Sequence, residues 1–146
     1  MSVAAGGRRA ARERALGLLY EAATKDLPIE EVLAALPVPA DPFAVEVVRG
    51  VEAKRAELDA LIGRFARGWR LERMPLLDLT VLRMAAFELT ERTDVPTAAI
   101  ISEAVELAKR FSTDNSGRFV NGVLASISAE VRPGRDPSSR GAEPDA

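Results

Sequence analysis

The sequence predicts an all-α fold of six or seven helices, and three observations support this prediction. Ala, Leu, Glu and Arg, which are strong helix formers, dominate the chain of 146 residues. Val, Ile and Thr nowhere alternate with polar residues over a long run, as a half-buried strand would require. Residues 76–89 (LLDLTVLRMAAFEL) are apolar on nearly every side of a helix, so other helices must enclose this one.

We expect residues 1–7 to be disordered and a first helix to run from about Arg8 to Lys25. Its apolar residues fall within one broad face, and Arg8 and Arg12 project onto the middle of that face. A charge does not enter an apolar core without a partner. We therefore expect the helix to extend beyond the body of the protein and to point these arginines along the surface. From the residues alone, a solvated basic terminus and a polyanion-binding arm stay equally open.

Prolines divide the segment that follows the first helix. We expect a short helix from Pro28 to Leu36, followed by a stiff and proline-rich connection. Asp41 can then cap a third helix, which we expect to run as one element from Pro42 to about Phe65.

A basic segment interleaved with aromatic residues comes next. Its arginines recur at three-residue spacing around two aromatic side chains: Arg64, Arg67, Arg70 and Arg73 around Phe65 and Trp69. Such a pattern can bind phosphates and stack nucleobases, but the aromatics can also belong to the core while the arginines flank a loop. For Trp69 we favour packing in the core. Whether the arginine run binds a nucleic acid stays open.

Two further helices follow the central one. The first begins beyond Pro96, buries its apolar residues up to Phe111 and turns its charged residues outward. A turn at residues 112–117 (STDNSG) separates it from the last helix, which we expect to end at Val131. Three residues of this turn can cap the last helix: Thr113, Asp114 and Asn115.

Three features of the C-terminal half each lead to a separate prediction. Gly122 weakens the last helix, so we expect it to serve the close approach of another backbone. Arg83 has apolar residues one turn away on both sides, so any ion pair must come from another helix. Residues 132–146 are rich in Pro, Ser and Gly and predict a disordered tail, which limits the folded domain to residues 8–131.

The composition excludes several classes of function. The chain has no cysteine and no histidine, which removes disulfides, Cys-His catalysis and Cys- or His-ligated zinc. It has no glycine-rich phosphate loop and no convincing catalytic constellation, so we expect a non-enzymatic protein without metal or cofactor. No signal peptide and no apolar run of 18 residues are present, which predicts a cytoplasmic protein with no membrane association.

The formal net charge of −2 hides an uneven distribution. Residues 1–14 carry a net charge of +3, residues 15–131 carry −5, and residues 132–146 are balanced. A basic end on an acidic body suits a polyanion at one site and a basic partner at another. The residues alone therefore predict an all-α binding module with a basic arm.

Four segments resemble, in the same order, the motifs of the NusB family of bacterial transcription antitermination factors. They are RRAARERALGLLYE (8–21), LTVLRMAAFEL (79–89), DVPTAAIISEAVELAKRF (94–111) and RFVNGVL (118–124). The resemblance covers about residues 8–131 and implies two packed three-helix bundles. It also implies a factor that binds the boxA element of nascent rRNA transcripts together with the ribosomal protein NusE, as part of the RNA polymerase antitermination complex.

The resemblance also implies roles for eight residues of this chain. RNA binding is carried over to Arg8, Arg9, Arg12, Asn115, Arg118 and Phe119, and NusE binding to Tyr20 and Asp78. Where this chain has Asn115, the family commonly carries an acidic residue, so the missing negative charge should strengthen RNA binding. Asp78 lies in the first turn of its helix, where we expect it to reach the surface and face a basic partner.

Two other hypotheses stay open beside the antitermination factor. The same fold occurs as an N-terminal RNA-binding domain of certain rRNA cytosine methyltransferases, which makes an rRNA-binding accessory module the alternative function. Some members of the family form homodimers that mask the RNA-binding arm, and the sequence leaves the choice between monomer and homodimer open.

Overall fold

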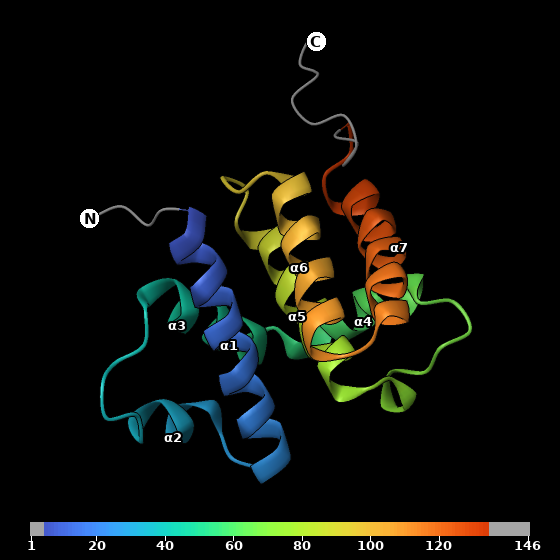
Figure 1. The fold of residues 1–146 in the computed structure, drawn as a ribbon. Helices are drawn as coiled ribbons and strands as arrows, with labels where there is room; N and C mark the ends of the chain where they lie inside the picture. Colours follow the sequence, from blue (N-terminus) through green and yellow to red (C-terminus); the bar gives the residue numbers. More distant parts are fainter. Residues whose placement is uncertain (1–4, 135–146) are drawn as a thin grey trace.

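Helix α5 (Leu76–Glu91) lies at the centre of the fold in the computed structural model, which describes residues 5–134 (Figure 1). Eleven of its sixteen residues are buried, and they occupy every side of the helix. Five other helices pack against it: α1, α3, α4, α6 and α7. The expectation of an enclosed core helix is confirmed.

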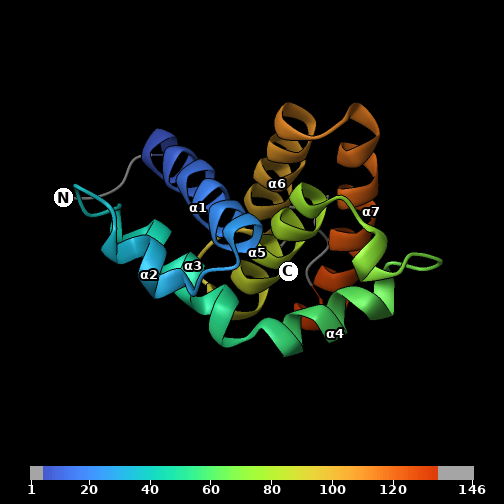
Figure 2. The same cartoon turned by 90° about the horizontal axis from the view of Figure 1, so that it is seen from below.

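Residues 5–134 form seven α-helices and one short 3₁₀ turn, without a strand. The elements besides α5 are α1 (Ala5–Lys25), α2 (Ile29–Ala34), α3 (Pro42–Ala53), α4 (Arg55–Phe65), η1 (Leu71–Arg73), α6 (Thr97–Phe111) and α7 (Asp114–Val131). Helices α1 to α3 gather on one side and α5 to α7 on the other, while α4 runs from the first group beneath the second (Figure 2). This arrangement confirms two packed three-helix bundles.

The third predicted helix is in fact two helices. We expected one helix from Pro42 to about Phe65, but the chain bends at Lys54, whose φ and ψ are −111° and 21°. Helix α3 packs on α1 and α5, whereas α4 packs on α5 and α7, and a straight helix cannot reach both bundles. The N-cap is confirmed, because the amide of Phe43 donates to Asp41 Oδ1 at 2.7 Å.

The folded region extends beyond the predicted limits at both ends. Helix α1 begins at Ala5, so residues 5–7 are helical where we expected disorder. At the other end, Arg132 is buried and donates five hydrogen bonds, so the expected disordered tail does not begin there. The rest of both predicted disordered segments, residues 1–4 and 135–146, lies outside the described residues.

The predicted close approach at Gly122 is wrong, because a Cβ atom placed there would have no neighbour within 4 Å. A close approach occurs instead at Gly50 of α3, where it involves a side chain: a Cβ atom there would overlap the ring of Phe87 on α5. The sequence suggests no such role for Gly50, because it depends on which helix crosses α3.

Two side chains of the second bundle test further predictions, one of which is wrong and one confirmed. Phe111, expected in the core, is 39% exposed, and the guanidinium of Arg110 lies 4.8 Å from its ring centroid. Arg83 Nε lies 2.7 Å from Asp59 Oδ1 of α4. This confirms that the ion-pair partner of Arg83 comes from another helix. This pair fastens α4 beneath α5.

Candidate functional site

The N-terminal end of α1 carries arginines that gather around one aromatic ring. The guanidinium carbons of Arg8, Arg12 and Arg92 lie 4.7, 5.4 and 5.1 Å from the centroid of Phe43. Cations are attracted to the face of an aromatic ring, by about 0.5–2 kcal/mol per contact. Phe43 therefore holds a cluster of positive charge where α1, α3 and the α5–α6 loop meet.

Arg12 is buried within this cluster, which corrects the expectation that it points along the surface. Its Nε and Nη2 donate to the two carboxylate oxygens of Glu88 at 2.7 and 2.8 Å. The side chains of both residues are under 10% exposed. Helix α1 can therefore lie against the body with its arginine inside, because Glu88 supplies the partner that a buried charge requires.

Arg9 lies on the surface and pairs with α6. Its Nε and Nη2 donate to Glu103 Oε1 and Oε2 at 2.9 and 2.8 Å, and these hydrogen bonds lower the pKa of Glu103. Neither bond uses Nη1 of Arg9, so that nitrogen keeps two N–H donors for a ligand.

Arg8 differs from its neighbours in how its charge is compensated. Arg92 pairs with Glu46 at 2.8 Å and with Asp94 at 3.0 Å, and its hydrogen bond to Asp94 lowers the pKa of that carboxyl to about 2. Arg8 forms no ion pair with any residue in 5–134, and its buried Nε has no hydrogen-bond partner there. The cluster therefore presents Arg8 as its least compensated cation.

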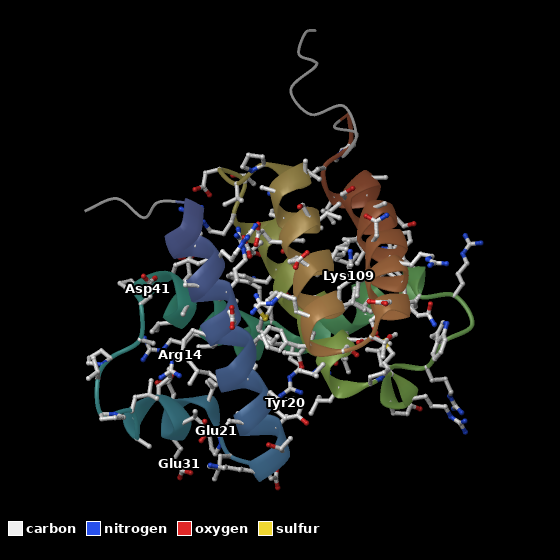
Figure 3. The ribbon with its side chains drawn as sticks, viewed as in Figure 1. Arg14, Tyr20, Glu21, Glu31, Asp41 and Lys109 are labelled. Atoms are coloured by element: carbon white, nitrogen blue, oxygen red, sulfur yellow. The ribbon has the colours of Figure 1, made fainter. Side chains whose placement is uncertain are left out.

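The other residues that the sequence predicts to bind RNA lie at the start of α7. Thr113 caps this helix by accepting from the amide of Ser116 at 3.0 Å, so Asn115 lies in the first turn. Asn115 and Arg118 are exposed, while Phe119 is half-buried. Gly117 packs against the stem of Lys109, which Figure 3 shows on α6 beside α7.

Asp78 is buried, with 4% of its surface exposed, so the expectation that it reaches the surface is wrong. Ser116 Oγ donates to Asp78 Oδ2 at 2.8 Å. The other oxygen, Oδ1, is buried and has no hydrogen-bond partner within residues 5–134. The carboxylate thus anchors the first turn of α7 to α5. Tyr20 is 40% exposed and points from α1 toward the second bundle (Figure 3).

The six residues assigned to RNA form two groups rather than one patch. Arg8 and Arg9 lie beside the N-terminal half of α6, where Glu103 accepts from Arg9, whereas Asn115 and Arg118 follow its C-terminal end at Ser112. Ser112 follows Glu103 by nine positions, or about 14 Å along the helix axis. Any single ligand that contacts both groups must extend along the C-terminal half of α6.

Several residues of the site carried no signal in the sequence, or only an ambiguous one. The sequence does not distinguish Phe43 from an ordinary apolar residue of its helix, and nothing in the spacing links Glu88 to Arg12. Trp69 did stand out, through its position among arginines, but the preference for packing it in the core is wrong. It is 52% exposed, and its ring centroid lies 5.5 Å from that of Phe119.

Membrane-spanning helices and clusters of metal-binding side chains are both absent from residues 5–134. None of the helices in residues 5–134 is long and apolar enough to cross a membrane. In the same part of the chain, no three Asp, Glu, His or Cys side chains come together in a group that could hold a metal ion.

Comparison with known proteins was made by sequence family, by sequence and by structure. The NusB family model matches residues 9–129. The "Transcription antitermination protein NusB" of Acidothermus cellulolyticus is 46% identical over 126 residues, which cover 84% of this chain and 87% of that protein. The structure resembles T. maritima NusB with a TM-score of 0.78, at 36% identity, covering 86% of this chain and 93% of that one.

A second solved structure, of the antitermination factors NusB and NusE in complex with dsRNA, contains the same fold. Its TM-score is 0.73 at 22% identity, and the match covers 84% of this chain and 96% of that one. The family match spans the region in which the sequence motifs occur, and the relative from A. cellulolyticus matches over most of its length. The chain belongs to the NusB family.

Proposed function

We propose that this protein is a cytoplasmic transcription antitermination factor that binds boxA-type RNA together with NusE, within the RNA polymerase antitermination complex. It acts by binding and not by catalysis. A relative that is 46% identical over 126 residues is named as a transcription antitermination protein. The observation that carries the proposal is the basic N-terminal part of α1, where Arg8 lies over Phe43 and Arg9 lies at the surface beside it, on an otherwise acidic protein.

The three N-terminal arginines have different roles in this proposal. Arg8, which forms no ion pair within residues 5–134, and Arg9, through its remaining Nη1 donors, contact RNA phosphates. Arg12 does not contact RNA, because its side chain is buried, its Nε and Nη2 donate to Glu88, and its guanidinium lies against the ring of Phe43. It is a positioning residue that fixes α1 so that Arg8 and Arg9 lie at the surface.

The first test removes the two phosphate contacts. Arg8→Ala/Arg9→Ala should weaken boxA RNA binding at least about ten-fold in gel shifts, because each charge-assisted contact contributes more than 1 kcal/mol. The slope of log affinity against log salt should fall by about 1.4, or 0.7 for each contact to a single strand.

The matched control is Arg49→Ala/Arg55→Ala, which removes the same charge from surface residues paired with Glu30 and Glu52. This variant should keep the affinity and nearly the whole salt slope of the unmodified protein. Equal losses in the two double variants would show that only net charge matters, which contradicts the proposed contacts.

The binding of NusE is proposed to use the exposed ring of Tyr20 and the net negative charge of residues 15–131, with Asp78 acting from inside through Ser116. Gel shifts with and without NusE test this part of the proposal. RNA binding that tightens with NusE supports it, and Tyr20→Ala should reduce that enhancement. The absence of any enhancement would instead favour an rRNA-binding accessory module.

A second prediction concerns Asn115 in the exposed first turn of α7. Asn115→Asp should weaken boxA RNA binding about three- to five-fold, because two like charges a few ångströms apart in water repel by about 1 kcal/mol. The same substitution should leave the melting temperature unchanged or slightly raised, since an acid in the first turn favours the helix dipole. Equal RNA affinities in a salt titration would remove Asn115 from the proposed contacts.

A further inference from the structure

The segment between α4 and α5 holds a tryptophan at the surface instead of in the core. Trp69 is 52% exposed, and its ring meets the half-buried ring of Phe119 at 5.5 Å with an angle of 55° between the planes. Exposing so large an apolar ring to water is unfavourable, and exposed tryptophans of this kind often serve as anchors in binding sites. One face of an aromatic pair is therefore available to a ligand.

The backbone between α4 and α5 is held near Trp69 by contacts that do not involve the tryptophan ring. The amide of Trp69 donates to the carbonyl of Ala66 at 3.0 Å. Gly68 has a φ of +78°, in a region that favours glycine, and so turns the chain immediately before Trp69. The outward position of the ring is thus built into the local backbone.

Arginines flank both aromatic residues in the sequence. Arg64 and Arg70 approach Glu130 and Glu72 at 3.4 Å, but these pairs are exposed and therefore weak in water. Three more exposed arginines have no acidic partner within residues 5–134: Arg67, Arg73 and Arg118. The surface thus combines an accessible aromatic face with uncompensated positive charge, which suits a ligand that is both aromatic and anionic.

We propose that Trp69 and Phe119 form a stacking platform for a nucleobase of single-stranded RNA, and that Arg67, Arg73 and Arg118 bind the adjoining phosphates. The proposal rests on the RNA-binding function proposed above and extends the RNA path beyond α7. Phe119 follows Arg118 on α7, and Trp69 contacts Phe119, so the platform adjoins the group of proposed RNA contacts at the start of α7. Stacking on an aromatic ring tolerates any base, so this end of the path should have little sequence preference.

The test uses the full-length protein with saturating NusE and a single-stranded RNA that extends beyond boxA on both sides. Trp69→Ala should weaken binding about ten-fold, as expected for the loss of one stacked base, without changing the salt slope. Arg67→Ala/Arg73→Ala should lower the salt slope by about 1.4. Trp69→Phe keeps an aromatic ring and should retain most of the affinity.

Two controls separate a contact from a general disturbance. Leu27→Ala removes a comparably exposed apolar side chain from the far end of α1 and should leave RNA binding unchanged. Trp69 is the only tryptophan of the chain, so its fluorescence should be quenched by RNA in the NusE-free protein, and the quenching should saturate.

The outcomes distinguish this inference from the function on which it rests. If Arg8→Ala/Arg9→Ala abolishes binding but Trp69→Ala and Arg67→Ala/Arg73→Ala bind like the unmodified protein, the platform is wrong and the proposed function stands. If the unmodified protein binds no boxA RNA even with NusE, both are wrong. If Trp69→Ala instead converts a dimer to a monomer in sedimentation and leaves RNA affinity intact, the surface is a homodimer interface and the platform is overturned.

Discussion

Arg12→Met should lower the free energy of unfolding by about 3–5 kcal/mol, the cost of leaving one member of a buried ion pair without its partner. Glu88 is 1% exposed, and water cannot take the place of the two hydrogen bonds that Arg12 donates. Chemical denaturation followed by circular dichroism measures this loss. The control is Arg9→Met, whose pair with Glu103 is exposed on the arginine side and should be worth under about 1 kcal/mol.

The double variant Arg12→Met/Glu88→Met shows whether the loss comes from the unpaired carboxylate. It should recover most of the stability, because replacing a whole buried pair by apolar side chains is often neutral. It should also bind boxA RNA nearly as well as the unmodified protein, since Arg12 is proposed to position α1 and not to touch RNA. A stable double variant that has lost RNA binding would return Arg12 to the list of contacts.

Arg132→Ala should lower the free energy of unfolding by about 3 kcal/mol, since hydrogen bonds from a charged donor are worth about 1.5–3 kcal/mol each. Its guanidinium donates at 2.8–3.3 Å to Thr97 Oγ1 and to the backbone carbonyls of Glu88, Leu89, Arg92 and Val95. It therefore caps the C-terminal end of α5, where a cation is favoured by the helix dipole, and holds the α5–α6 loop.

Arg132→Lys separates geometry from charge in this prediction. Lysine keeps the charge but is a point donor that cannot span the same carbonyls, so it should recover less than half of the loss. The control is Arg118→Ala, which replaces an exposed arginine of α7, the helix that ends just before Arg132. It should change stability by under about 0.5 kcal/mol. A loss of similar size in both alanine variants would contradict the capping role.

The sequence predicts the second bundle better than the first. Helices α6 and α7 have apolar residues at regular helical spacing and clear boundaries, so their ends agree with the expected ones within a few residues. The bend at Lys54 was missed because no proline or glycine marks it. It results from the need of α3 and α4 to pack against different helices, which is a property of the assembled fold and not of the local sequence.

The environments of the candidate site residues could be predicted only in part from the sequence. The position of Arg12 on an apolar face was read correctly, but its partner Glu88 lies 76 residues away, and sequence spacing cannot reveal such a pair. The burial of Asp78 depends in the same way on Ser116, 38 residues later. Tertiary partners decide whether a charged residue on a helix faces water or the interior.

Both ends of the folded chain meet at the last turns of α5, and this has a consequence for how the protein is made. Arg12 is synthesised long before Glu88, whereas Arg132 follows Leu89, whose carbonyl it caps, by 43 residues. At about 5–20 residues per second, that interval lasts roughly 2–9 seconds. During this time the junction lacks its final donor, and the nascent chain cannot complete its core. The surface that carries Arg8 and Arg9 should therefore become competent only after nearly the whole domain has left the ribosome.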